Sequence, residues 1–172
     1  MRIRIHELGK LQADWKAFLG EGDGDGLPIT VVYTTQDGTL AALKTAAALA
    51  RDLNARLGLI ITEVVPFRLP IDQPRVSVDF LKKRQDELVS DAGLGGEQIR
   101  VQICLCRDTK ETLGRLLPTP SLVVLGGRRR LWPSRERRLE TFLSRLGHQV
   151  IFVDAAACKS AGSEVSRIPL RQ

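Results

Sequence analysis

Hydrophobic runs and helical patterns alternate along the chain from residue 28 onward. Short runs rich in β-branched and aliphatic residues have the length and composition of buried strands. They cover 29–35, 57–65, 98–106, 121–127 and 149–154. The segments between them show helical spacing of apolar positions. These predicted helices cover 39–58, 76–91, 108–117 and 134–147.

Capping residues sharpen two of the predicted helices. Thr39 is placed to cap the first helix, and Gly58 is placed to end it. Asp108 and Glu111 have the spacing of a capping box, and the helix that they open must stop at Pro118.

The alternation predicts the α/β class. Strands without polar alternation, separated by helices, form a parallel sheet with both faces covered. Right-handed crossovers then give a doubly wound, Rossmann-like fold. We expect five parallel strands in the order 3-2-1-4-5, with helices on both faces. In such folds ligands bind at the carboxyl ends of the strands, where the strand order reverses.

The 172 residues fit one domain with two extensions. Residues 1–27 are interpreted as an N-terminal helical extension and linker, 28–154 as the α/β domain, and 155–172 as a C-terminal tail. Within the first extension, "RIRI" alternates like a short strand, and Leu8, Leu11, Trp15 and Phe18 share one helical face. We expect residues 1–20 to pack outside the sheet, and the alternative is that "RIRI" covers a sheet edge.

Composition points to a cytoplasmic protein. The first residues lack the apolar core of a secretory signal, and no apolar run is long enough to span a bilayer. Three cysteines do not suggest a disulfide framework. We therefore expect no membrane partner.

Positive charge is concentrated in one part of the chain. Residues 100–150 hold eleven Arg and Lys against four Asp and Glu, a balance of +7 in a chain whose net charge is +6. Six of those arginines lie between 128 and 138. This asymmetry indicates an anionic partner, and the alternative is a solvated basic face.

The arginines follow a predicted strand end, where this architecture binds ligands. Glycines allow close backbone approach to a phosphate, guanidinium groups bind two oxygens at once, and Ser134 opens a helix. We therefore predict an anion site, without chemistry on the ligand. Its expected residues are Gly126, Gly127, Arg128, Arg129, Arg130 and Ser134.

The sequence resembles the universal stress protein family over roughly 28–154. The stretches that carry the resemblance are "ALKTAAALARDLNARLGLIITEVVP" and "LVVLGG…LSRLGHQVIFVD". The resemblance implies an adenine nucleotide alpha hydrolase-like fold, a role in the stress response, and ATP or another adenine nucleotide as ligand. It also implies a homodimer formed through the last strand, whose apolar residues Val150 to Val153 would lie at a sheet edge.

The ATP-binding members of that family carry an acidic residue after the first strand and a G-x2-G-x9-G-[ST] loop after the fourth. Here the acidic position falls on Thr34, or on Asp37 if the turn shifts. Gly126 matches the first glycine, the second falls on Arg129, and the final pair falls near Glu136 and Arg137. The ATP-binding loop is therefore degenerate.

Other chemistry has little support in the sequence. Cys104 and Cys106 lack the further ligands of a zinc site and are interpreted as buried and inert. His6 and His148 stand without a nucleophile motif. We predict no catalytic residue, no metal and no required cofactor.

Two classes of function follow. The first is a non-catalytic regulatory or binding module that holds a nucleotide or another phosphate-bearing ligand at the Gly126–Arg138 loop. The second is an interaction module that kept the fold and lost the ligand. Its partner would be another protein, and nucleic acid is a weaker candidate. A nucleotide hydrolase is a third, weaker interpretation.

Overall fold

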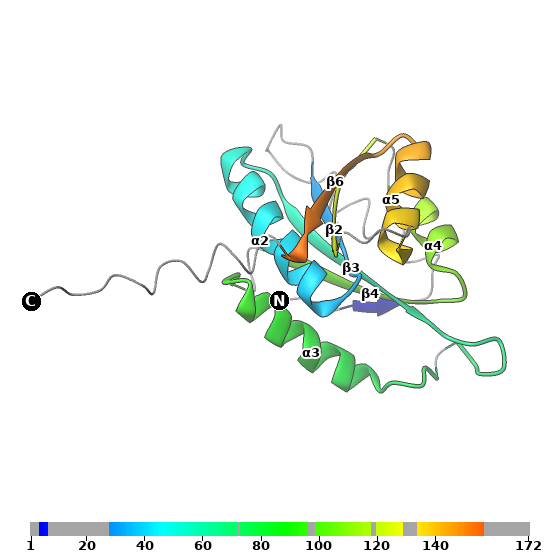
Figure 1. Ribbon diagram of the computed structural model, residues 1–172. Helices are drawn as coiled ribbons and strands as arrows, with labels where there is room; N and C mark the ends of the chain where they lie inside the picture. The colour runs from blue at the N-terminus through cyan, green and yellow to red at the C-terminus, as the bar shows by residue number, and fades with distance from the viewer. Residues whose placement is uncertain are drawn as a thin grey trace, which may run out of the picture.

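The computed structural model describes residues 4–6, 28–71, 73–95, 99–117, 120–128 and 134–156. Strands and helices alternate along the chain from residue 29 to 154 (Figure 1). The strands are β1 (Arg4–His6), β2 (Ile29–Val32), β3 (Leu57–Val64), β4 (Ile99–Cys106), β5 (Leu122–Gly127) and β6 (Gln149–Asp154). The helices are α2 (Gln36–Asp52), α3 (Val78–Asp91), α4 (Thr109–Leu116) and α5 (Arg135–Arg145).

The strands form one parallel sheet in the order β1-β4-β3-β2-β5-β6. The five strands from β2 onward confirm the predicted order 3-2-1-4-5. The expectation that residues 1–20 lie outside the sheet is wrong for Arg4–His6, which pair with Gln102–Cys104. The short strand fits there because β4 would otherwise be the edge of the sheet. The predicted helix around Trp15 and the tail after residue 156 lie outside the described residues.

Helices cover both faces of the sheet, as predicted (Figure 1). One apolar core joins α2 and α3 to the sheet through residues such as Leu43, Leu59 and Leu88. The second core joins α4 and α5 to the other face through residues such as Leu113 and Leu143. Helices bury both faces of the sheet, which explains why most strands show no polar alternation.

The first helix is shifted from its predicted bounds. Thr35, not Thr39, caps α2 by accepting a hydrogen bond from the amide of Gly38 at 3.1 Å. Thr39 is buried in the first turn, and its hydroxyl accepts from the amide of Thr34. The helix ends at Asp52, because Asn54 has a φ of 48° and Gly58 is already paired with Thr30 in the sheet. Thr35 and Thr39 have the same capping chemistry, and the structure uses Thr35.

The other helix starts follow their capping residues. Asp108 caps α4 by accepting from the amide of Glu111 at 2.8 Å, as the sequence predicts. Ser134 caps α5 through the amide of Arg137 at 3.3 Å. These two helix starts stand at the carboxyl ends of the strands. Across the described part of the chain, no helix combines the length and the apolar content that a membrane span requires.

Candidate functional site

The strand order reverses between β2 and β5. The chain passes from β2 through α2 to β3 on one side, and from β5 through α5 to β6 on the other. Their carboxyl ends are therefore the switch point at which doubly wound folds bind ligands. Thr34 and Asp37 follow β2, and Gly126, Gly127 and Arg128 end β5 or follow it. The fold thus gathers these predicted residues in one region.

At the carboxyl ends of β2 and β5, the protein's own backbone fills the space in which a ligand would bind. A Cβ atom on Gly126 would lie 1.8 Å from the carbonyl oxygen of Gly38, and one on Gly38 would lie 2.5 Å from the carbonyl oxygen of Gly126. The Thr34 hydroxyl also donates a 2.5 Å hydrogen bond to the Gly126 carbonyl. Gly126 is therefore needed for the packing of the first turn of α2 on β5.

Gly127 is also in close contact with protein. A Cβ atom there would lie 3.1 Å from both Glu136 Cγ and Phe152 Cζ. The start of α5 and the edge strand β6 thus pack against the end of β5. Both glycines that the sequence assigned to phosphate approach have packing roles of their own.

The described arginine of the loop is partly neutralised. A guanidinium nitrogen of Arg128 lies 3.6 Å from a carboxylate oxygen of Asp37, and both side chains are substantially exposed. Arg129 and Arg130 lie outside the described residues. The hydroxyl of Ser134 caps α5 by accepting a hydrogen bond from the amide of Arg137. The two candidates for the acidic position thus have different contacts, because Thr34 binds a carbonyl and Asp37 faces Arg128.

An open cleft of about 720 Å³ lies beside this packed region. It extends over the ends of β2 and β3 to the first turns of α4 and α5. Of the predicted site residues that the structure describes, Thr34 alone lines it. The wall residues are Tyr33, Thr34, Thr35, Thr62, Val64, Arg107, Asp108, Thr109, Lys110, Arg135, Glu136, Arg138 and Leu139.

Among the described residues, four cationic side chains line the cleft, and one of them, Arg107, already has hydrogen-bond partners in the protein. Arg107 donates hydrogen bonds to the backbone carbonyls of Val65, Pro66 and Leu69. Its guanidinium also lies 5.2 Å from the centre of the Phe67 ring. Arg107 therefore holds the connection between β3 and α3 and is committed to it.

The other three cations are uncommitted to carboxylates within the described part of the chain. Arg135 and Arg138 are exposed and have no ion pair there. Lys110 lies 5.6 Å from the centre of the Phe142 ring. Arg137, which is not part of the cleft wall, is instead paired with Glu140 at 2.6 Å and lies over the Phe152 ring. The cleft thus has positive charge that its own acids leave unpaired.

The two helix starts differ in their capacity to attract an anion. The cap of α4 is the carboxylate of Asp108, which already places negative charge at that helix terminus. The cap of α5 is the neutral hydroxyl of Ser134. Arg135 and Arg138 stand in the first turn and just beyond it, and they outnumber the single acid of that turn that lines the cleft, Glu136. An anion in the cleft is therefore favoured at the start of α5.

Sequence reasoning missed the cleft residues outside the loop. Arg107 and Lys110 follow β4 directly, and the carboxyl ends of parallel strands meet at one edge of a sheet. Arg135 and Arg138 belong to the predicted Gly126–Arg138 loop but are not among its expected site residues. The order of elements would have been enough to group all four.

The described cysteines are unsuited to chemistry in the cleft, and His148 lies apart from it. Burial raises the pKa of Cys104 to about 12 and raises that of Cys106, so neither thiol readily forms the reactive thiolate. His148 precedes β6 at the opposite end of the sheet, is 5% exposed, and has no described hydrogen-bond partner for either ring nitrogen. Cys158 lies outside the described residues.

Comparison with known proteins identifies the fold. No protein-family model matches the sequence, and no curated protein matches it. A universal stress protein from Archaeoglobus fulgidus superposes with a TM-score of 0.51 at 14% identity, covering 74% of this chain and 98% of that one. A member of the same family from Burkholderia pseudomallei gives 0.50 at 22%, covering 76% and 98%.

A third solved structure, a universal stress protein in complex with cAMP, gives a TM-score of 0.49 at 18% identity and covers 76% of this chain and 99% of that one. The superpositions on the Archaeoglobus fulgidus and Burkholderia pseudomallei proteins show that the chain has a UspA-like α/β fold, which is the fold that the sequence resemblance implied.

Proposed function

We propose that this chain is a non-catalytic binding module that holds a phosphate-bearing ligand, in the class of adenine nucleotides, in the cleft at the start of α5. The observation that carries the proposal is the charge of the cleft. Lys110, Arg135 and Arg138 line about 720 Å³ of open space without a described carboxylate partner. Forked guanidinium donors suit phosphate oxygens, and the neutral cap of α5 leaves its positive end open to an anion.

The position of the ligand differs from the sequence-based expectation. We place the phosphate on Arg135 and Arg138 because Gly126 and Gly127 contact the chain's own atoms. Arg128, which lies 3.6 Å from Asp37, then flanks the site. A nucleotide fits better than a bare anion, because the cleft also has the apolar side chains of Val64 and Leu139.

Calorimetry with ADP at low and at physiological salt tests the proposal. Arg135→Ala combined with Arg138→Ala should weaken ADP binding about 10- to 100-fold, because each phosphate contact with a charged donor is worth about 1.5–3 kcal/mol and neighbouring contacts are not additive.

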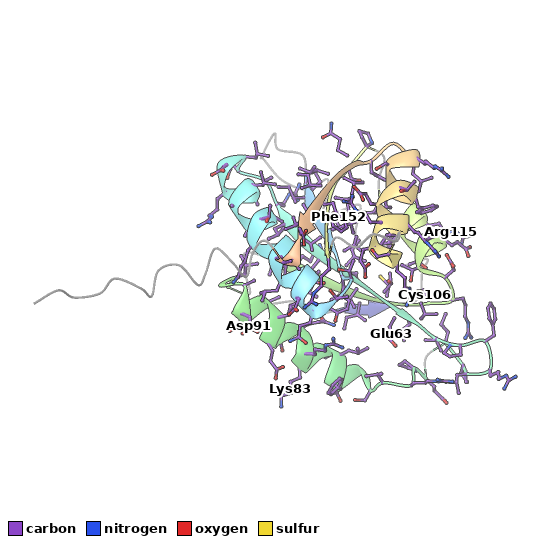
Figure 2. The ribbon with its side chains drawn as sticks, in the orientation of Figure 1. Glu63, Lys83, Asp91, Cys106, Arg115 and Phe152 are labelled. Atoms are coloured by element: carbon purple, nitrogen blue, oxygen red, sulfur yellow. The ribbon has the colours of Figure 1, made fainter. Side chains whose placement is uncertain are left out.

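Arg115→Ala combined with Arg145→Ala is the matched control. It removes the same charge from α4 and α5 without changing the cleft wall. Figure 2 shows Arg115 on the outer side of α4, and its guanidinium pairs with Glu111. Arg145 stands about 15 Å along α5 from Arg135. Equal losses in both double variants would mean a nonspecific basic surface. Absence of ADP binding to the parent protein would refute the proposal.

A second candidate is the interaction module, favoured by the edge strand β6. Its residues Val150 to Val153 are only partly buried, and among the described strands β6 pairs with β5 alone. An unpaired edge of this kind favours pairing with another strand. We propose a cytoplasmic homodimer formed through β6, acting in the stress response. Light scattering at micromolar concentration tests the dimer, and a monomer mass would count against it.

A further inference from the structure

A second, smaller hollow lies beneath α3, on the face of the sheet covered by α2 and α3. It is a cavity of about 60 Å³ bounded by the ends of β2 and β3, the start of α2 and the inner side of α3. Its wall residues are Tyr33, Gln36, Ile61, Thr62, Glu63, Leu81, Arg84, Gln85 and Leu88. Figure 2 shows Glu63 on the last part of β3, whereas Lys83 extends from the outer side of α3.

Gln85 is the unusual residue of this cavity. Its side chain is 3% exposed, and neither its amide nitrogen nor its amide oxygen has a hydrogen-bond partner among the described residues. Burying a polar group without a partner destabilises the folded state, so native proteins almost always satisfy such a group. The amide offers a donor and an acceptor side by side and needs a complementary group.

Two further polar groups of the wall have unused hydrogen-bonding capacity. Arg84 donates a 2.6 Å hydrogen bond to the Tyr33 hydroxyl oxygen, which leaves the hydroxyl hydrogen free to be donated. The Glu63 carboxylate is half-buried and has no ion pair within the described residues. Burial raises the pKa of Glu63, and the nearby Arg84 charge opposes that rise. The charges of Arg84 and Glu63 balance, so the wall favours a neutral ligand.

We propose that this cavity is a binding site for a neutral group that carries an N–H donor beside an acceptor, as in a carboxamide, a urea or the amino edge of a nucleobase. Such a group satisfies both atoms of the Gln85 amide at once and offers a donor to Glu63. A cavity of 60 Å³ holds about four water molecules, which matches the heavy atoms of a small amide or the edge of a base.

The position of the cavity allows two sources for that group. Tyr33 and Thr62 belong to the walls of both the cavity and the large cleft, so the two spaces adjoin at the ends of β2 and β3. A free small amide would fill the cavity alone. A nucleotide lying across the strand ends would place its base edge on Gln85 and its phosphate toward Arg135, and this second source rests on the proposed function.

Nuclear magnetic resonance of the side-chain amide of Gln85 tests the site. Acetamide should shift that resonance saturably, with a dissociation constant no tighter than roughly tens of micromolar because it has only four heavy atoms. AMP should shift it if the group is a base edge, whereas ribose 5-phosphate, which has the phosphate but no base, should leave it unchanged. A response to acetamide alone or to AMP alone supports the site and identifies the source.

Gln85→Met keeps the size of the side chain and removes the amide. Resonances of neighbouring cavity residues then report the binding of acetamide or AMP, whichever binds the parent. In this variant the affinity should fall at least about ten-fold, and the melting temperature should be unchanged or raised. Gln149→Met, at an exposed position on β6, is the matched control and should bind as the parent does.

A parent protein whose Gln85 amide responds to neither acetamide nor AMP overturns the inference, since the cavity then holds water only. Binding of ADP to the cleft would still be measurable in that case. The proposed function and this inference can therefore fail separately.

Discussion

The two sides of β2 differ sharply at the carboxyl end of the sheet. Toward β5, backbone meets backbone, because Gly38 and Gly126 approach so closely that no side chain fits on either. Toward β3, the strand ends open into a cleft lined by cations. The same switch point thus contains a packed half and an open half. Residues of the packed half should govern stability, and residues of the open half should govern binding.

Gly126→Ala should have the largest effect. The new methyl group would lie 1.8 Å from a backbone oxygen, so α2 would have to move off β5. We expect a loss of about 3 kcal/mol or more in the free energy of unfolding, at the upper end of overpacking effects. Denaturant unfolding measures it. Gly95→Ala is the control, because nothing lies within 4 Å of the added Cβ there and stability should barely change.

The double variant of Arg135 and Arg138 should show the opposite behaviour. ADP raises the melting temperature of a protein that binds it only when folded. We expect this rise in the parent and its loss in the double alanine variant. Without ADP the variant should unfold within about 0.5 kcal/mol of the parent, because both side chains are exposed. A large stability loss without ligand would mean that the open half is also structural.

His148, which lies at the opposite end of the sheet, should make the stability of the protein depend on pH. Burial lowers its pKa from the ordinary 6.5, so the unfolded chain takes up the proton first as the pH falls. Stability from this group is fully present above pH 6.5 and decreases as the pH falls through 6.5 toward the lower pKa of the folded state.

Replacing His148 with Met tests that assignment by urea unfolding between pH 7 and pH 5. The variant should lose less stability than the parent over this range. Parallel losses in the two proteins would assign the pH dependence to other groups.

Arg128→Ala should have the smallest effect. Its contact with Asp37 is an exposed ion pair at 3.6 Å, and such pairs contribute about 0–1 kcal/mol. We therefore expect little change in unfolding and a modest change in ADP affinity, well below that of the Arg135 and Arg138 variant. If Arg128→Ala abolishes ADP binding, the ligand contacts the end of β5 rather than the start of α5.

Much of the fold could be predicted from the sequence, because its signals are local. Unbroken apolar strands and amphipathic helices fix a parallel sheet, and the cap at Asp108 was read correctly. Two details could not be read from local signals. Thr35 and Thr39 could both cap α2, and the three residues of β1 gain their place only through pairing with β4.

The candidate site was less predictable than the fold. A glycine at the end of β5 serves a close phosphate and a close backbone equally well, and the sequence around Gly126 cannot distinguish them. Lys110 and Arg138 form one charged cleft only because the fold brings the strand ends together. Gln85 lies on the inner side of α3, and only the three-dimensional arrangement leaves its amide without a described partner.

A crystal structure of the protein grown with ADP tests the central claim most directly. The account predicts phosphate oxygens within about 3 Å of the guanidinium nitrogens of Arg135 and Arg138, in the cleft at the start of α5. Phosphate bound against Gly126 and Gly127 instead, or a cleft that stays empty while ADP binds elsewhere, would contradict it.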